Sequence, residues 1–188
     1  MRGLQHAGHG GREDVRRMPV TAQDAGAGRP SAVDLRAIGL FGGLGEELLV
    51  ELAERLPLGH VASGEVVFSE DDQGREMFVV LSGELEVVKR AGGGRVTLLQ
   101  VIGPREWFGE MSLLDVMPRP VTVRAVAPSR VLRIRPTDLE ALYRRSAKDY
   151  ALFVMNIARQ LSRRLRHTEK ALADAITSVL EPPDDPAA

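Results

Sequence analysis

The sequence predicts a mainly β protein with flanking helices, built as a sandwich or closed barrel and followed by a long C-terminal helix. Two observations carry this prediction. Between His60 and Ile134, short apolar and β-branched runs alternate with turn residues, which is typical of sandwiches and barrels. From Pro136 to Leu180, apolar residues recur in steps of three and four, which is the period of an amphipathic helix.

Length and composition limit the possible functions. At 188 residues, the chain is long enough for one domain with extensions. A formal net charge of −1 gives no overall attraction to nucleic acid or to an acidic surface. The sequence has no cysteine, which excludes disulfides and thiolate metal sites and leads us to expect a cytoplasmic protein. No apolar run reaches the roughly 18 residues of a membrane span, so we expect no membrane association.

The N-terminal part is predicted to be a tail followed by a helix. Residues 1–32 are rich in Gly, Arg, Ala and His without an apolar period, so we expect a disordered tail. Arg16-Arg17 is not followed by an apolar segment, so it is not an export signal. Leucines at helical spacing then predict an amphipathic helix over 45–56, which ends before Pro57.

The central part is predicted to consist of short strands. Ser63-Gly64, Ser82-Gly83 and Gly92-Gly93-Gly94 are turn or hairpin signals. The apolar runs that follow such polar stretches predict strands at 66–68, 77–81, 85–88, 95–101, 121–126 and 131–134.

The stretch from Phe108 to Ala125 carries the chemistry. Gly109 has no Cβ, so a backbone or ligand can approach it closely. Glu110 opens a short apolar helical turn, and the N–H groups of a helix start attract anions. Arg119 follows nine residues later, and its planar guanidinium suits phosphate oxygens. The stretch therefore predicts a site for a ligand with a phosphate and a nearby hydroxyl.

The pattern F-G-E, then leucines, a short loop and P-R resembles the phosphate-binding cassette of the cyclic nucleotide-binding domain, as found in the catabolite-activator family. The resemblance covers residues 38–165 and implies a jelly-roll β-barrel (a double-stranded β-helix) that binds cyclic AMP or a related cyclic nucleotide, without a metal. It implies that Glu110 binds the ribose 2′-hydroxyl and Arg119 the cyclic phosphate. The ligand-binding residues expected on this basis are Gly109, Glu110, Met111, Ser112, Arg119, Pro120 and Val121.

The sequence departs from the family pattern in three places. The residue after the cassette arginine usually donates its backbone N–H to the phosphate, but here it is Pro120, which has none. Asp71 and Arg105 stand where the family often has glycine in a turn. Each must therefore accept the φ angle that its turn requires.

The C-terminal part is predicted to hold two helices. Thr137 and Glu140 form a capping-box pattern, so we expect a helix that starts there and runs to Arg145. A longer helix is expected over 148–180, with a heptad seam that predicts a homodimer. The seam consists of Ala151, Val154, Ala158, Leu161, Leu165, Thr168, Leu172, Ala175 and Val179. We therefore divide the chain into a tail (1–32), the barrel domain with its N-terminal helix (33–147), the dimerisation helix (148–180) and a second tail (181–188).

These features favour a sensor module rather than an enzyme. Only eight residues follow Leu180, too few for a helix-turn-helix, so we expect no specific binding of nucleic acid. We expect the long helix to pass ligand binding on to an unidentified protein effector.

Three alternatives remain at this point. A ligand-free barrel that acts as a dimeric scaffold is favoured by Pro120. A transcription regulator could read DNA in some other way. A cupin-type metal enzyme would share the jelly roll but needs clustered histidines, whereas His60 and His167 are isolated in the sequence.

Overall fold

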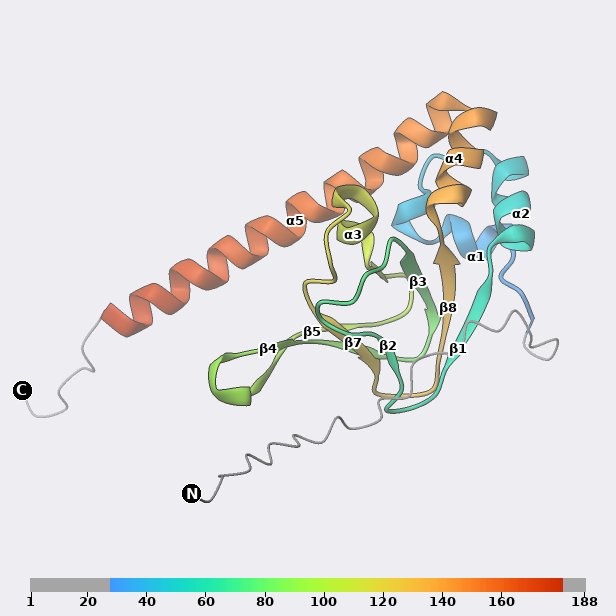
Figure 1. Cartoon of the computed structure of the whole chain (residues 1–188). Coiled ribbons are helices and arrows are strands. Elements are labelled where there is room, and N and C mark those ends of the chain that lie inside the picture. The colour runs from blue at the N-terminus through green and yellow to red at the C-terminus, as the bar shows by residue number, and fades with distance from the viewer. Residues whose placement is uncertain (1–27, 181–188) are drawn as a thin grey trace, which may run out of the picture. The chain divides into compact units, whose positions relative to one another are not determined.

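The computed structural model describes residues 28–180 and divides them into two compact units. The first unit contains residues 55–136 together with 28–29, and the second contains residues 30–54 and 137–180. Each unit is described by itself below (Figure 1). The first is built of strands and the second of helices, so the predicted mainly β fold with flanking helices is confirmed.

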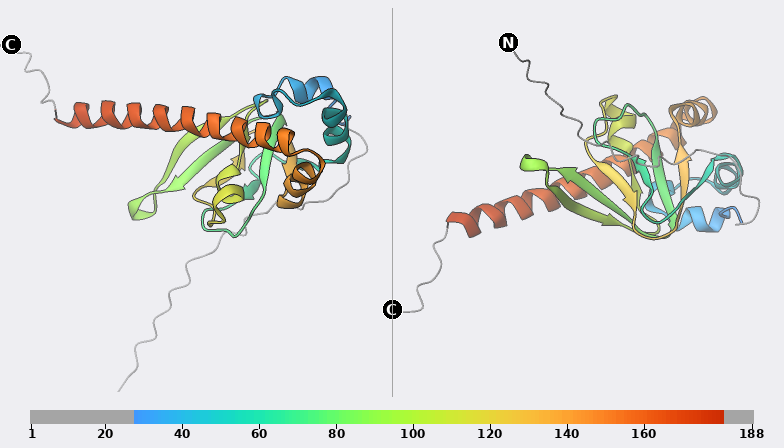
Figure 2. Two further views of the ribbon diagram at one scale, coloured as in Figure 1. Left: turned by 90° about the horizontal axis from the view of Figure 1, so that it is seen from above. Right: turned by 60° about the horizontal axis from the view of Figure 1, so that its bottom comes forward.

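The first unit is a pair of four-stranded antiparallel sheets. The described part of this unit contains the strands β1 (Leu58–Val61), β2 (Val66–Phe68), β3 (Met77–Ser82), β4 (Leu85–Arg90), β5 (Val96–Ile102), β6 (Trp107–Phe108), β7 (Thr122–Ala125) and β8 (Ser129–Ile134). One sheet has the order β1-β8-β3-β6 and the other β2-β7-β4-β5. Successive strands thus alternate between the two sheets for much of the chain, which is the arrangement of a jelly roll. In Figure 2, β4 and β5 form a long hairpin within this unit.

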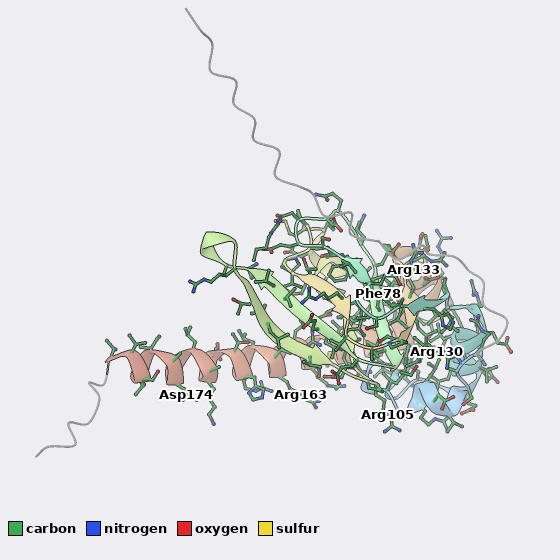
Figure 3. The ribbon with its side chains drawn as sticks, turned by 90° about the horizontal axis from the view of Figure 1, so that it is seen from below. Phe78, Arg105, Arg130, Arg133, Arg163 and Asp174 are labelled. Atoms are coloured by element: carbon green, nitrogen blue, oxygen red, sulfur yellow. The ribbon has the colours of Figure 1, made fainter. Side chains whose placement is uncertain are left out.

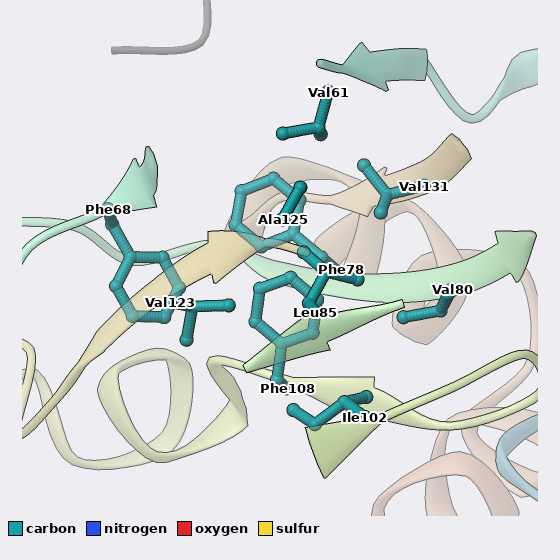
Figure 4. Close-up of a cluster of buried hydrophobic side chains, with 10 residues drawn as sticks. All are labelled: Val61, Phe68, Phe78, Val80, Leu85, Ile102, Phe108, Val123, Ala125 and Val131. Atoms are coloured by element: carbon teal, nitrogen blue, oxygen red, sulfur yellow. The ribbon is translucent and has the colours of Figure 1, made fainter. Parts of the chain in front are cut away.

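The core of the barrel lies between the two sheets. Ten buried side chains form it, three of them phenylalanines whose rings stack or tilt against one another at 5.3–6.2 Å (Figure 4). Both sheets contribute, as expected when alternate residues of each strand point inward. The cluster consists of Val61, Phe68, Phe78, Val80, Leu85, Ile102, Phe108, Val123, Ala125 and Val131.

Two strands of the barrel were not predicted from the sequence. β1 reads Leu-Gly-His-Val, with no clear alternation, and it becomes a strand because all four residues pair with β8. β6 has only two residues, Trp107 and Phe108, which pair with β3 and are both buried. Such short strands are defined by long-range pairing rather than by their own sequence pattern, so local periodicity cannot reveal them.

Two helical segments interrupt the barrel. The short 3-10 turn η2 (Gly92–Gly94) joins β4 to β5. The helix α3 (Glu110–Asp115) lies between β6 and β7, at the position predicted for the phosphate-binding stretch.

The described part of the second unit, up to Leu180, is built of helices without strands. It includes α1 (Ala32–Arg36), the 3-10 turn η1 (Gly39–Phe41), α2 (Glu46–Arg55), α4 (Pro136–Arg145) and α5 (Ala147–Leu180). A capping box formed by Ser31 and Asp34 starts α1. The predicted helix over 45–56 is confirmed as α2. The predicted start of α4 is wrong: the helix begins at Pro136, which suits the first helical position, so Thr137 lies inside it and is not the N-cap.

The N-terminal half of α5 is packed and its C-terminal half is exposed. Phe153 and Ile157 are buried, and the ring of Phe153 lies 6.1 Å from that of Phe41. Asn156 donates to the carbonyl oxygens of Leu40 and Gly42 at 3.0 and 2.9 Å, which fixes the helix to the η1 turn. From Leu165 onward, every described residue is exposed. None of the helices within residues 28–180 combines the length and apolarity of a membrane span.

Candidate functional site

At the start of α3, the backbone of Gly109 passes close to the backbone of Glu76 and to the side chain of Arg119. Gly109 is the N-cap of this helix and has a φ of +83°, in the left-handed region that favours glycine. A Cβ at Gly109 would lie 2.9 Å from both Arg119 Nη1 and the carbonyl oxygen of Glu76. Only glycine therefore allows these three segments to meet without a shift.

Arg119 is enclosed at this crossing. Arg119 is only 3% exposed, and its Nη1 donates a hydrogen bond to the carbonyl oxygen of Gly109 at 3.1 Å. The guanidinium carbon lies 4.1 Å from the centre of the Phe68 ring, within the range of a cation–π contact. On another side, a Cβ at Gly74 would lie 3.0 Å from Arg119 Nε and Nη2. The aromatic ring of Phe68, the carbonyl of Gly109 at the start of α3, and the backbone at Gly74 thus surround the guanidinium.

The backbone of Arg119 is also fixed. Its N–H donates to the carbonyl oxygen of Asp72, and its own carbonyl accepts from the N–H of Asp71, both at 2.9 Å. The loop between β2 and β3 is therefore tied to the loop that carries Arg119. This explains how residues far apart in the sequence form one site.

The electrostatics of Arg119 are a balance between burial and nearby carboxylates. Burial lowers the pKa of the guanidinium below its ordinary value. Three carboxylates oppose this shift and favour the cation: Glu76, with the largest effect, then Asp72 and Glu110. Arg119 Nε is buried and has no hydrogen-bond partner. Since buried charges and donors are normally paired, the Nε–H group can donate a hydrogen bond to an additional, anionic partner.

The predicted site residues on α3 separate into buried and exposed ones. Glu110 and Ser112 are 2% and 1% exposed, and both lie in the first turn of the helix that Gly109 opens. The Ser112 hydroxyl is buried and has no hydrogen-bond partner. Met111 is 53% exposed, so its side chain lies apart from the buried group.

Pro120 and Val121 have other surroundings. Lys89 Nζ donates to the carbonyl oxygen of Pro120 at 2.7 Å and also pairs with Glu70 at 3.2 Å. A hydrogen bond from the Arg90 backbone is the main cause that lowers the pKa of Glu70. The side chain of Val121 packs on the barrel core. The structure therefore places Arg119 against Gly109, at the start of the helix whose first turn holds the buried side chains of Glu110 and Ser112. The side chains of Met111 and Val121 have other surroundings.

Sequence reasoning missed four residues that surround Arg119. Phe68, Asp72, Gly74 and Glu76 come from β2 and the loop after it. The only local signal is a glycine in a polar stretch, which does not distinguish a site from an ordinary loop. No group of His, Cys, Asp or Glu within residues 28–180 is arranged to hold a metal.

The fold and the site define a class: a jelly-roll barrel that holds a buried arginine against the start of a helix inserted between two of its strands. Residues 58–146 match the family model described as the cyclic nucleotide-binding domain. The chain belongs to the cyclic nucleotide-binding domain family.

Several similar proteins are named as regulators. The chain is 32% identical over 142 residues to a Mycobacterium tuberculosis protein named CRP-like cAMP-activated global transcriptional regulator. The aligned region makes up 76% of this chain and 62% of that protein. The crystal structure of the Thermus thermophilus catabolite activator protein matches with a TM-score of 0.65 and 32% identity, over 74% of this chain and 63% of that one. The N-terminal domain of a Streptomyces coelicolor transcriptional regulator matches with a TM-score of 0.63 and 30% identity, over 70% of this chain and 94% of that domain. The chain thus spans less than two thirds of the length of the mycobacterial relative.

Proposed function

We propose that this chain is a regulatory module that binds a cyclic nucleotide, and that cyclic AMP is its main ligand. The observation that carries the proposal is the buried guanidinium of Arg119, whose Nε has no hydrogen-bond partner. A cyclic phosphate supplies one negative charge and acceptor oxygens, which is what a buried arginine with a spare donor requires. The mycobacterial relative is named as cAMP-activated, which supports the choice of ligand.

The proposed roles follow from the chemistry of each residue. Arg119 binds the phosphate, and the Glu110 carboxylate accepts a hydrogen bond from the ribose 2′-hydroxyl. Gly109, Met111 and Ser112 contribute backbone groups around the start of α3, so the exposure of the Met111 side chain does not conflict with its role. Val121 would likewise act through its backbone, next to Pro120.

We further propose that α5 carries the output and joins two copies of the chain. Its exposed half presents large apolar side chains, which a coiled-coil partner would cover. These side chains are Leu165, Leu172, Ile176 and Val179.

A scaffold without a ligand is the second candidate function, and Pro120 favours it. The missing N–H removes a charge-assisted hydrogen bond of about 1.5–3 kcal/mol, which is roughly ten- to a hundredfold in affinity. Pro120→Ala restores the donor with little change in size. We expect this variant to bind cyclic AMP about tenfold more tightly than the unsubstituted protein, as measured by calorimetric titration.

A calorimetric titration of the whole chain decides between the two functions. Cyclic AMP and cyclic GMP should be compared with 5′-AMP, which has the same base but a more highly charged, open phosphate. We expect saturable binding of a cyclic nucleotide at one site per chain, and its loss in Arg119→Ala. If neither the unsubstituted protein nor Pro120→Ala binds any of the three, the sensor proposal is wrong and the scaffold remains.

A further inference from the structure

A second arginine, Arg133, forms an ion pair with Glu76, one of the carboxylates that act on Arg119. Glu76 immediately precedes β3, and Arg133 lies on β8 opposite Phe78 of β3. The Glu76 carboxylate and the Arg133 guanidinium form an ion pair, and their side chains are only 27% and 19% exposed. Figure 3 shows Arg133 and Phe78 near one another in the barrel. A partly buried pair of this kind is screened less by salt than one on the open surface.

Glu76 is also part of the wall of the site. Its carbonyl oxygen lies 2.9 Å from where a Cβ on Gly109 would be, so its backbone borders the crossing at the start of α3. Among the carboxylates that act on Arg119, Glu76 has the largest effect on its pKa. Glu76 therefore connects Arg133 with Arg119, by an ion pair on one side and by its electric field on the other.

A carboxylate in this position opposes the binding of an anion. It attracts the Arg119 cation, for which a phosphate must then compete, and it repels the phosphate itself. A cation that pairs with the carboxylate reduces both effects. Resting on the function proposed above, we propose that Arg133 neutralises Glu76 and thereby sets the affinity of the site for its anionic ligand.

Arg133 thus affects ligand binding indirectly, because it neutralises the charge of Glu76 and need not touch the ligand. This distinguishes it from an arginine that only stabilises the barrel. A structural arginine would be needed whether or not Glu76 is charged, whereas a neutralising arginine becomes dispensable once Glu76 is neutral.

Three variants of the whole chain test the inference by calorimetric titration with cyclic AMP at low salt. Arg133→Ala leaves the Glu76 charge uncompensated, and we expect Kd to rise about tenfold. Glu76→Gln keeps the size and removes the charge, and we expect Kd to fall about threefold. The double variant should return to within about threefold of the unsubstituted protein. Rescue of the first substitution by the second is the required result.

The chain offers a matched control. Arg124 on β7 forms an ion pair with Glu86 on β4, in the other sheet, and Glu86 is not among the three carboxylates that were named above as acting on Arg119. Arg124→Ala removes the same charge from a cross-strand pair of the same barrel. We expect its affinity for cyclic AMP to stay within about twofold of the unsubstituted protein.

Salt gives a second, independent measure. In Arg133→Ala the penalty is electrostatic, so raising the salt from about 0.05 to about 0.5 M should reduce the tenfold loss to about threefold. If Arg133→Ala is too unstable to measure, Glu76→Gln alone decides, because weaker binding in that variant contradicts the inference.

The outcomes separate the inference from the function on which it rests. Binding by the unsubstituted protein with an unchanged Kd in Arg133→Ala overturns the inference alone. Equal weakening of Arg133→Ala and the double variant does the same, because the effect then does not pass through Glu76. If neither the unsubstituted protein nor Pro120→Ala binds any of the three nucleotides, the proposed function is refuted, and the inference with it.

Discussion

At the scale of single residues, the structure explains how two departures from the family pattern are accommodated. Asp71 and Arg105 occupy positions where the family often has glycine, and their φ angles are +70° and +72°. Both turns therefore have the left-handed backbone that glycine adopts freely, although neither residue is a glycine. Val116, which ends α3, also has a positive φ of +54°, an uncommon conformation for a β-branched residue. These backbones store strain that the surrounding structure must offset.

Arg105 gives the clearest test of this strain. Its side chain is exposed, and an arginine gains nothing from the left-handed region, whereas glycine adopts it freely. We expect Arg105→Gly to raise the free energy of unfolding by about 0.5–1 kcal/mol, measured by urea denaturation. Arg105→Ala is the control, because it removes the same side chain without relieving the backbone. An equal effect of both variants would show that the φ angle is not the cause.

Arg119 and Glu110 should contribute unequally to ligand binding. In the proposed complex Arg119 would face an ionised phosphate, and hydrogen bonds to charged groups are worth about 1.5–3 kcal/mol each. We expect Arg119→Lys, which keeps the charge but loses the planar fork, to weaken cyclic AMP binding about tenfold, and Arg119→Ala to weaken it about a hundredfold. Glu110→Gln keeps an acceptor oxygen and should cost less than Arg119→Lys. Titration of the three variants gives the order, and unchanged affinity in Arg119→Ala would exclude this site.

At the scale of elements, the sequence revealed those with a strong local pattern. The helices α2 and α5 and the strands β2, β3, β4, β5, β7 and β8 were predicted within one or two residues of their bounds. β1 and β6 were missed because pairing with distant strands defines them. The same reason limits what could be predicted of the site. Gly109, Glu110 and Arg119 share one stretch with a recognisable spacing, whereas Phe68, Gly74 and Glu76 reach Arg119 only through the folded barrel.

The heptad seam of α5 is a property of the element and remains to be tested. Leu172 lies in the exposed half and is 60% exposed within the single chain. In a two-stranded coiled coil, Leu172→Glu would bury two like charges at the seam, so we expect the dimer dissociation constant to rise at least tenfold. Analytical ultracentrifugation over a concentration series measures this constant.

A control for the seam lies on the same helix. Thr177 is exposed and is placed by the helical repeat on the face opposite Leu172. Thr177→Glu adds the same charge and should leave self-association unchanged. If both variants dissociate alike, or if the unsubstituted chain sediments as a monomer at high micromolar concentration, α5 does not form the proposed seam.

At the scale of the whole molecule, the question is whether the barrel and the helical unit respond together. A ligand shifts a conformational equilibrium only by its difference in affinity for the two states. We therefore expect cyclic AMP to change amide hydrogen exchange in residues 108–125 and also in α4 and α5, as measured by mass spectrometry. Arg119→Ala with the same nucleotide is the control. Protection confined to residues 108–125 would make the chain a passive binder.

Because α5 has a packed half and an exposed half, a small rotation of the packed half produces a larger displacement at the exposed end. Asn156 and Phe153 fix its first half to the η1 segment, so that half must follow any movement of the η1 turn. The free half from Leu165 to Leu180 extends about 24 Å at 1.5 Å per residue. A tilt of about 10° at Arg164 would thus move Leu180 sideways by about 4 Å. A small change in angle at the packed half of α5 therefore becomes a displacement of about 4 Å at Leu180, where the proposed seam between two copies of the chain would lie.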